Sequence, residues 1–209
     1  MEILNEISSY LQKGKAPQVK ELTQKALDEG IPPQKILEEG LLAGLDIIGE
    51  KFKRDEVFVP QMLITARAMN TGTEVLKPYL VAENVEPRGV VVLGTVKGDL
   101  HDIGKNLVRM MLEGKGFTVI DLGVDVPAEK FVSAIGENHA DIVACSSLLT
   151  TTMEELRNVI QAIEFAGLRK DVKIMVGGAP VTQEFSDKIG ADCYTEDAAS
   201  AADAAVKII

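Results

Sequence analysis

The sequence predicts a protein of two parts: a helical bundle, followed by a parallel β-sheet with helices on both of its faces. Over residues 1–84, apolar residues recur every three or four positions, the spacing of one face of a helix. Over residues 90–209, short apolar, β-branched runs alternate with helical patterns, which is typical of a parallel α/β sheet. Residues 85–89 combine Glu, Pro and Gly and are expected to form a linker.

The first part is expected to contain four helices. Four apolar stripes mark them: Ile3, Leu4, Ile7 and Leu11; Val19, Leu22, Ala26 and Leu27; Ile36, Leu37, Leu41, Leu45, Ile48 and Phe52; and Leu63, Ala66, Met69, Thr73 and Leu76. Gly30 is expected to end the second helix. Pro33 and Pro60 suit the first turns of the third and fourth helices. Short connections between the helices predict an antiparallel four-helix bundle.

The second part is expected to be a five-stranded parallel sheet with a Rossmann-like (flavodoxin-like) arrangement. The expected strands are Val90–Val96, Thr118–Leu122, Ile142–Ser147, Lys173–Val176 and Cys193-Tyr194. The expected helices are Lys105–Glu113, Ala128–Asn138, Thr152–Ala166, Gln183–Ile189 and Ala198–Ile208. Because crossovers between parallel strands are right-handed, the predicted strand order is 2-1-3-4-5, with the winding reversed between the first and third strands.

Polar and small residues follow the strands on both sides of this reversal. Asp99 and His101 come after the first strand, Ser146 and Thr150 after the third, and Gly177-Gly178 after the fourth. Ligands of such sheets bind outside the carboxyl ends of the strands at the reversal. These residues are therefore expected to border one crevice, where glycine lets a ligand lie against the backbone.

Three short motifs in this part resemble those of a known family. Asp99, His101 and Gly104 match Asp-x-His-x-x-Gly, Ser146-Ser147-Leu148 matches Ser-x-Leu, and Gly177-Gly178 matches Gly-Gly. In this order and at this spacing they resemble the cobalamin-binding domains of methionine synthase and of the corrinoid proteins of methanol, methylamine and methoxyaromatic methyltransferase systems. The resemblance extends over nearly the whole chain.

The resemblance implies that cobalamin, or a related corrinoid, is the cofactor and that His101 is the axial ligand of its cobalt. Asp99 would accept a hydrogen bond from the other ring nitrogen, and Thr152 would extend the pair to a hydroxyl. The methionine synthase pattern has serine at the position of Thr152, so this residue is a departure. When the methyl group leaves, His101 is expected to gain a proton through Asp99 and Thr152. From the residues alone, Thr152 equally suits the capping residue of the following helix.

The remaining residues of the motifs are expected to contact the cofactor. These are Gly98, Leu100, Asp102, Ile103 and Gly104 in the loop with His101, and Ser146, Leu148, Thr150, Gly177 and Gly178 around the buried nucleotide tail. Two alternatives stay open. The hydroxyls of Ser146 and Thr150 suit the N-terminal amides of a helix, and Gly177-Gly178 suits a simple turn.

The helical part resembles the cap that covers the methyl face of the corrinoid in this family. The match lies in Gly49-Glu50-Lys51-Phe52 and Phe58-Val59-Pro60-Gln61. It implies an apolar lid of Phe52 and Val59 over the methyl group, with Glu39 at the corrinoid edge. Periodicity alone equally suits Phe52 and Val59 to the bundle core. Because a closed lid blocks methyl exchange, the cap is expected to move about the linker.

The resemblance implies a methyl carrier. Such a protein accepts a methyl group on Co(I) from a substrate-specific methyltransferase. It delivers the group from methyl-Co(III) to a second methyltransferase, whose acceptor is tetrahydrofolate or a thiol such as coenzyme M, and a reductive activase restores it. The two His and two Cys are scattered and cannot form a thiolate zinc site. The chain is therefore expected to be the non-catalytic corrinoid subunit of a multi-component methyltransferase, with the chemistry supplied by the cofactor.

Three alternatives are weighed against the carrier. A cobalamin-binding regulator or sensor usually adds a DNA-binding domain, for which 209 residues leave no room, and some carry a Trp that is absent here. The small subunit of a cobalamin mutase shares the three motifs but not the bundle with Phe58-Val59-Pro60-Gln61. A flavodoxin-like or phosphate-binding domain would bind no cobalt.

Composition narrows the expected partners and location. A net charge of −10 argues against binding to nucleic acid or to an anionic membrane. No apolar stretch approaches the ~20 residues of a membrane helix, and the N-terminus lacks the pattern of a signal peptide. The cytoplasm is the expected location. Cys145 and Cys193 do not suggest a disulfide framework, and Cys145 is expected to be a buried thiol.

Overall fold

The chain divides into two compact units, residues 1–86 and 87–209. The structure, a computed structural model, describes residues 2–82 and 87–209. Of the expected linker at 85–89, residues 85 and 86 lie outside the described residues, whereas residues 87–89 belong to the second unit.

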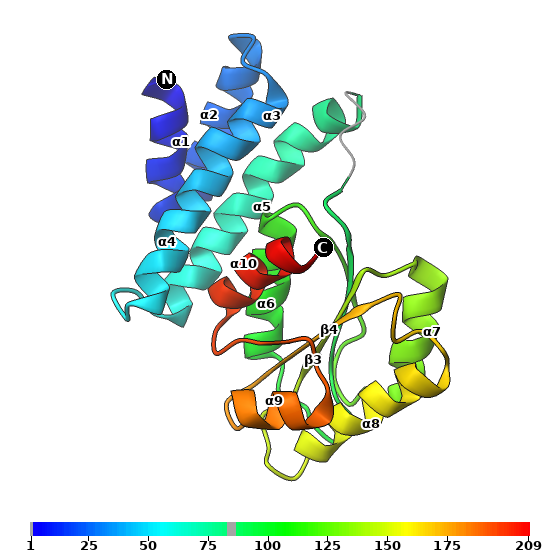
Figure 1. Ribbon diagram of the computed structural model, residues 1–209. Coiled ribbons are helices and arrows are strands. Elements are labelled where there is room, and N and C mark those ends of the chain that lie inside the picture. The colour runs from blue at the N-terminus through cyan, green and yellow to red at the C-terminus, as the bar shows by residue number, and fades with distance from the viewer. Residues whose placement is uncertain (1, 83–86) are drawn as a thin grey trace. The chain divides into compact units, whose positions relative to one another are not determined.

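The first unit has the four helical segments that the apolar stripes predict (Figure 1). They are α1 (Glu2–Gln12); α2 (Ala16–Asp28); a continuous run of α3 (Pro33–Lys35), the π-helix η1 (Ile36–Leu42) and α4 (Ala43–Lys53); and α5 (Val59–Ala82). Gly30 follows the end of α2 with a φ of 79°, as expected for a helix-ending glycine. The π-helical turns were not predicted, because periodicity does not separate π-helical from α-helical turns.

Glycines let the helices of this unit approach closely. A Cβ atom on Gly40 would lie 3.2 Å from the Ile7 side chain, and one on Gly44 would lie 3.0 Å from the Ser8 carbonyl oxygen. These two glycines therefore bring η1 and α4 against α1. The predicted stripe of α5 is wrong at Leu63, which is 36% exposed. Met62 is buried instead, because its spacing of four residues from the buried Ala66 places both on one face.

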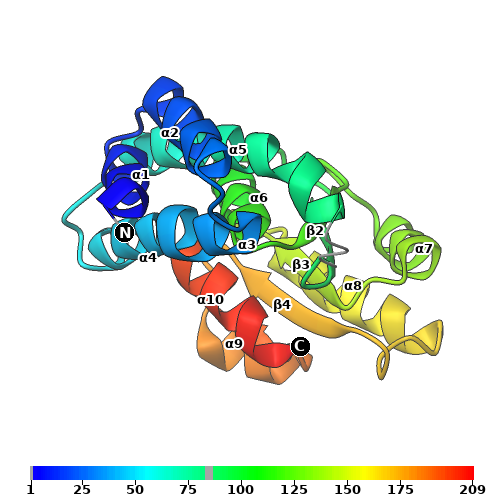
Figure 2. The same cartoon turned by 90° about the horizontal axis from the view of Figure 1, so that it is seen from above.

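The second unit has the predicted parallel sheet, in the order β2-β1-β3-β4-β5. Its strands are β1 (Val90–Thr95), β2 (Thr118–Asp121), β3 (Ile142–Ser146), β4 (Lys173–Gly177) and β5 (Cys193–Tyr194). Its helices are α6 (Ile103–Gly114), α7 (Ala128–Asn138), α8 (Met153–Phe165), α9 (Gln183–Ile189) and α10 (Ala198–Ile208). Helices α6 and α10 pack together on one face of the sheet, and α7, α8 and α9 lie on the other (Figures 1 and 2).

The register of the sheet places three strand ends side by side. Thr95 of β1 pairs with Ser146 of β3, which pairs with Gly177 of β4. The loops that leave these strands therefore start from one edge, at the winding reversal. Cys145 is buried one residue before this edge, as predicted. Burial raises the pKa of the Cys145 thiol to about 12, which leaves it unreactive near neutral pH.

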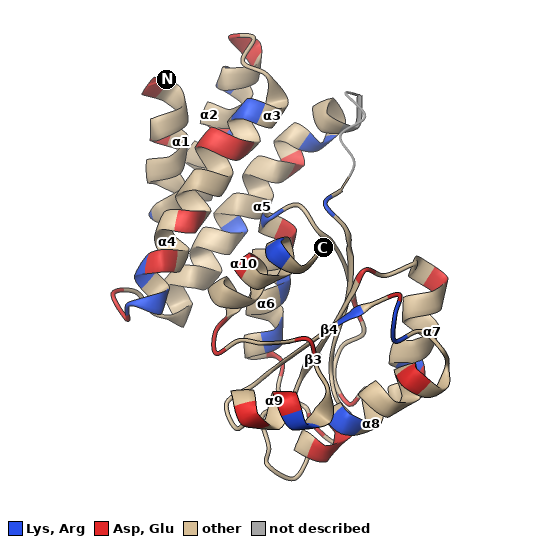
Figure 3. Ribbon diagram, viewed as in Figure 1, with Lys and Arg blue, Asp and Glu red and all other residues tan. Residues whose placement is uncertain are grey.

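Charged side chains of both signs are spread along the helices of each unit (Figure 3). Among the described residues, no helix is both long and apolar enough to cross a membrane.

A matched pair of glycine substitutions tests the packing at the sheet edge. Gly178→Ala should destabilise the protein by about 3 kcal/mol or more, because its Cβ would lie 1.8 Å from the Ser147 carbonyl oxygen. Gly190 also has a positive φ, of 80°, but no atom lies within 4 Å of the Cβ position. Gly190→Ala should therefore cost only about 1 kcal/mol. Urea unfolding of the full chain measures both, and equal costs would contradict this packing.

Candidate functional site

The loop after β1 is held in a fixed turn. Gly98 has a φ of 78°, a conformation that favours glycine. The Asp99 N–H donates to the Val96 carbonyl oxygen at 3.1 Å, and the Thr95 hydroxyl donates to the His101 carbonyl oxygen at 2.8 Å. This turn directs the Asp99 side chain inward, where it is fully buried.

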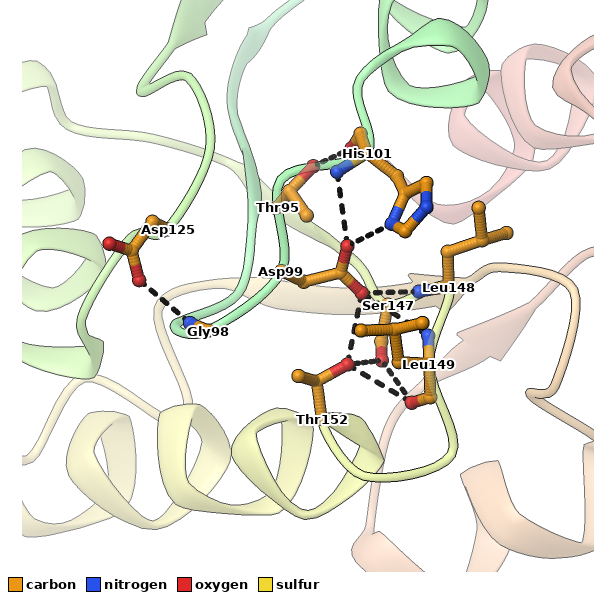
Figure 4. A network of polar contacts seen from close by, with 9 residues as sticks. All are labelled: Thr95, Gly98, Asp99, His101, Asp125, Ser147, Leu148, Leu149 and Thr152. Carbon is orange, nitrogen blue, oxygen red and sulfur yellow. Dashed lines mark hydrogen bonds and ion pairs between the residues drawn. The ribbon is translucent and has the colours of Figure 1, made fainter.

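The Asp99 carboxylate is the centre of the polar network in Figure 4. Its Oδ1 lies 2.7 Å from Nδ1 of His101 and accepts from the His101 N–H at 3.1 Å. Its Oδ2 accepts from the N–H groups of Leu148 and Leu149 at 2.7 and 3.2 Å, and from the Thr152 hydroxyl at 2.9 Å. One carboxylate thus joins the loop after β1 to the loop after β3.

These contacts fix the charge of Asp99 and the tautomer of His101. Burial acts to raise the pKa of Asp99, but hydrogen bonds from Leu148, His101 and Thr152 outweigh it and hold that pKa well below its usual range. An ionised carboxylate only accepts hydrogen bonds, so Nδ1 of His101 carries the proton. Nε2 keeps its lone pair, on a side chain that is 50% exposed.

Thr152 is part of this network and is not a capping residue. It precedes α8 at the N-cap position, but its side chain makes no capping hydrogen bond. Its oxygen instead lies 2.9 Å from the Asp99 carboxylate and 2.9 Å from the hydroxyl of the buried Ser147. We did not predict that the Ser147 hydroxyl would take part in this network. Ser147 directly follows β3 and is fully buried, whereas Ser146, the last residue of β3, is partly exposed.

Ser146 and Thr150 lie at the same edge but outside the network. Within the described residues, their hydroxyls make no hydrogen bond with a protein group, so they do not satisfy helix amides. Gly177 accepts from the Ser147 N–H at 3.1 Å. The close approach of Gly178 is to the Ser147 backbone, so the chain itself requires this glycine, whatever ligand lies nearby.

Around His101 the edge is apolar and open. Four large aliphatic side chains in the loops after β1 and β3 and at the start of α6 are exposed: Leu100 (71%), Ile103 (67%), Leu148 (41%) and Leu149 (40%). No atom lies within 4 Å of a Cβ built on Gly104. Asp102 is exposed and accepts from the Asn106 side chain at 3.1 Å. Exposed apolar side chains in one place indicate a binding surface.

A buried ion pair anchors the start of α6, directly after the His101 loop. Lys105 Nζ lies 2.7 Å from both carboxylate oxygens of Asp121, at the end of β2, and its side chain is only 2% exposed. Arg109 adds a contact to Asp121 at 3.3 Å. Burial acts to raise the pKa of Asp121, but these cations and the Gly123 N–H lower it.

The possible metal ligands at this site suit a metal that is already bound within a macrocycle. Among the described residues, no group of three or more His, Cys, Asp and Glu could hold a bare metal ion. His101 offers one free nitrogen on an apolar surface. A corrin ring would supply four nitrogen ligands to its cobalt, so one imidazole and an exposed apolar surface fit such a group.

Three predicted residues lie in the first unit. Phe52 and Val59 are partly buried, so neither belongs to the fully buried bundle core, and the neighbouring Phe58 is 68% exposed. Glu39 is exposed on η1, with its carboxylate 3.9 Å from Lys35.

Both units match families of cobalamin-binding proteins. Residues 89–206 match the family described as B12 binding domain, and residues 3–77 match a second family of the same description. The chain is 45% identical over 199 residues to dimethylamine corrinoid protein 3 of Methanosarcina acetivorans, covering 95% of this chain and 93% of the relative. It is 47% identical over 180 residues to trimethylamine corrinoid protein 1 of that organism, covering 85% of this chain and 83% of that relative.

Two solved structures are similar. One is a cobalamin-binding protein from Desulfitobacterium hafniense, with 31% identity, a TM-score of 0.85, and 99% and 98% of the two chains covered. The other is a chain of the methanol:cobalamin methyltransferase complex MtaBC from Methanosarcina barkeri, with 30% identity, a TM-score of 0.83, and 99% and 80% covered.

Fold, site and relatives together define a corrinoid-binding protein with a helical and a Rossmann-like unit. The chain belongs to the B12 binding domain family, and its cofactor is cobalamin or a related corrinoid.

The contacts of Asp99 predict a pH-dependent stability. Asp99→Asn should destabilise the protein by about 2 kcal/mol at neutral pH, because an amide cannot accept all five hydrogen bonds. A lowered pKa in the folded state gives stability that is present above about pH 4 and lost as the pH falls below it. The gap between wild type and Asp99→Asn should therefore narrow below pH 4.

Urea unfolding at several pH values measures this gap, with Asp187→Asn as the control. Asp187 is exposed on α9 and accepts one side-chain hydrogen bond, from Gln183. A gap for Asp99→Asn that is constant across acid pH would contradict the account.

Proposed function

We propose that this chain is a methyl-carrying corrinoid protein of a multi-component methyltransferase. A substrate-specific methyltransferase loads it, and a second methyltransferase passes the methyl group to tetrahydrofolate or to a thiol such as coenzyme M. A reductive activase reduces the oxidised corrinoid protein so that it can accept a methyl group again. The observation that carries the proposal is the half-exposed imidazole of His101, whose Nδ1 is held by the buried Asp99 carboxylate at an apolar edge.

The relatives support the carrier over a regulator or a mutase subunit. They are named corrinoid proteins for dimethylamine and trimethylamine, and the match extends over both units. The similar chain in MtaBC is part of a complex described as a methyltransferase. When bound, the corrinoid supplies a cobalt centre that carries the methyl group between donor and acceptor.

His101 would hold the cobalt of the corrinoid through Nε2. Asp99 holds Nδ1 at 2.7 Å and so orients the ring. Thr152 and two backbone N–H groups hold Asp99. Such carboxylate–histidine pairs raise the basicity of the ligand and fix its direction.

When the corrinoid releases Nε2, His101 would gain a proton. The proton would enter at Nε2, while Asp99 holds Nδ1. Thr152 adds a hydrogen bond to the carboxylate. Release of the ligand would then take up one proton from solvent.

The other predicted residues complete the proposal. Gly98, Leu100, Asp102, Ile103 and Gly104 would lie beside the corrin ring, and Ser146, Leu148, Thr150, Gly177 and Gly178 beside the nucleotide tail. Residues 1–84 would form the cap, with Phe52 and Val59 over the methyl group and Glu39 at the ring edge. The cap would move about residues 85–89 to expose the methyl group to each partner.

Two histidine substitutions test the ligand. His101→Asn should weaken corrinoid binding by roughly 10- to 100-fold and change the absorbance spectrum of the bound cofactor, because the axial nitrogen is lost. His139, the second of the two histidines, is exposed at the end of α7 with a φ of 50°. Asparagine tolerates that conformation, so His139→Asn should leave binding and spectrum unchanged. Titration of the apoprotein measures both, and identical behaviour of the two variants would refute the ligand assignment.

Proton uptake on methyl release is tested by difference. Demethylation of wild type by a thiol acceptor should take up about one more proton per methyl group than demethylation of His101→Asn. The acceptor contributes equally to both, so the difference belongs to the imidazole. Thr152→Val, which keeps the shape but not the hydroxyl, should slow or reduce the uptake. An indicator dye in weakly buffered solution follows it, and equal proton release by wild type and His101→Asn would count against the proposal.

A further inference from the structure

Asp125 has a backbone conformation that its place in the fold does not explain. Within the described residues, the non-glycine residues with positive φ are Asp55 (57°), Asp125 (53°) and His139 (50°). His139 directly follows α7, and Asp55 follows Arg54, the C-cap residue of α4; a left-handed residue commonly ends a helix at such positions. Asp125 lies between β2 and α7, two residues before the N-cap residue Pro127, where no helix ends. Such a conformation persists where the surroundings require it.

The contacts of Asp125 show what this conformation achieves. Its carboxylate Oδ1 accepts from the Gly98 N–H at 2.7 Å (Figure 4), and its own N–H donates to the Asp99 carbonyl oxygen at 2.9 Å. One residue therefore holds the backbone on both sides of the Asp99 Cα atom. A glycine would adopt the same φ without strain, but it would lack the acceptor.

The neighbouring backbone makes this clamp rigid. Val126 forms a parallel bridge with Val96, and its N–H donates to the Thr95 carbonyl oxygen at 3.0 Å. The Thr95 N–H in turn donates to the Gly123 carbonyl oxygen at 3.0 Å. The loop before α7 is thus tied along the end of β1. Asp125 extends this attachment to the turn that carries the Asp99 carboxylate.

We propose that Asp125 is a positioning residue for the cofactor ligand: it clamps the Gly98–Asp99 backbone so that Asp99 meets Nδ1 of His101. Asp125 itself is exposed and does not contact the imidazole, so it acts through Asp99. The proposal rests on the proposed function only for its consequence for corrinoid binding. The effect on the His101 ring is independent of cobalt.

Two substitutions separate the clamp from the backbone strain. Asp125→Asn keeps an oxygen acceptor and tolerates a positive φ. Asp125→Gly relieves the strain but removes the acceptor. Asp55→Gly is the matched control, because it relieves the same strain at the end of α4, and no side-chain contact is lost among the described residues. If Asp125→Gly does not fold, Asp125→Ala removes the acceptor while keeping a Cβ atom.

The first readout is the tautomer of His101 in the full-length apoprotein. In a His139→Asn background, ¹⁵N-histidine labelling leaves His101 as the one labelled ring. At mildly alkaline pH, Asp125→Asn and Asp55→Gly should keep the Nδ1–H signal of the parent. Asp125→Gly should lose it in favour of the Nε2–H tautomer. An unchanged ring signal in a folded Asp125→Gly or Asp125→Ala variant would overturn the inference, whatever the corrinoid does.

The second readout is corrinoid affinity, measured by titration with cobalamin. Asp125→Gly should bind about 10-fold more weakly, as for other residues that orient a metal ligand, and Asp125→Asn should remain within about twofold of the parent. Equal weakening by Asp125→Asn and Asp125→Gly would overturn the clamp. If His101→Asn leaves binding unchanged, the proposed function fails, while the ring signal still decides the inference about Asp125.

Discussion

The site depends on one buried carboxylate. Asp99 is fully buried and accepts five hydrogen bonds from groups on two loops. A buried charge is costly unless it is fully paired, so the two loops must lie where their donors meet it. The requirement works in both directions: the sheet register brings the loops together, and the carboxylate holds them there. The half-exposed imidazole of His101 lies at the surface of this network, and its hydrogen bond to the buried Asp99 sets the orientation of the ring.

The same edge shows why a small α/β unit suits a large cofactor. The polar groups that surround the Asp99 carboxylate satisfy one another in the interior, while four large aliphatic side chains near the imidazole are exposed. A flat macrocycle would then bury apolar surface without displacing any hydrogen bond of the network. Gly178 contributes to the inward part, because its lack of a Cβ lets β4 and the Ser147 backbone come together.

The fold was predictable where patterns repeat. Strand and helix alternation, together with the handedness of crossovers, was sufficient for the sheet order, which the structure confirms. The π-helical turns of η1 were not predicted, because a π-helix of seven residues within a longer helical run displaces the apolar stripe only locally. The burial of Met62 in place of Leu63 depends on a rotation of α5 that periodicity resolves only to about one residue.

The sequence motifs predicted several residues of the site, but they predicted fewer of the contacts that those residues make. Asp99, His101 and Thr152 come together as expected, but Ser147 and Asp125 were missed. Ser147 occupies a position that its motif leaves open, and Asp125 contacts backbone groups of a turn that lies 27 residues earlier in the chain. No spacing rule along the chain shows such contacts. Gly178 was predicted as a residue that contacts the cofactor, whereas the structure shows that its close packing against the Ser147 backbone requires glycine.

The central claim is that Nε2 of His101 is the axial ligand of the corrinoid cobalt. Electron paramagnetic resonance of the cofactor in its Co(II) state tests it most directly, with the His139→Asn protein labelled with ¹⁵N-histidine. The account predicts that the nitrogen splitting changes from the pattern of one ¹⁴N nucleus to that of one ¹⁵N nucleus. A splitting that does not respond to the label would contradict it, since the axial nitrogen would then belong to the cofactor's own base.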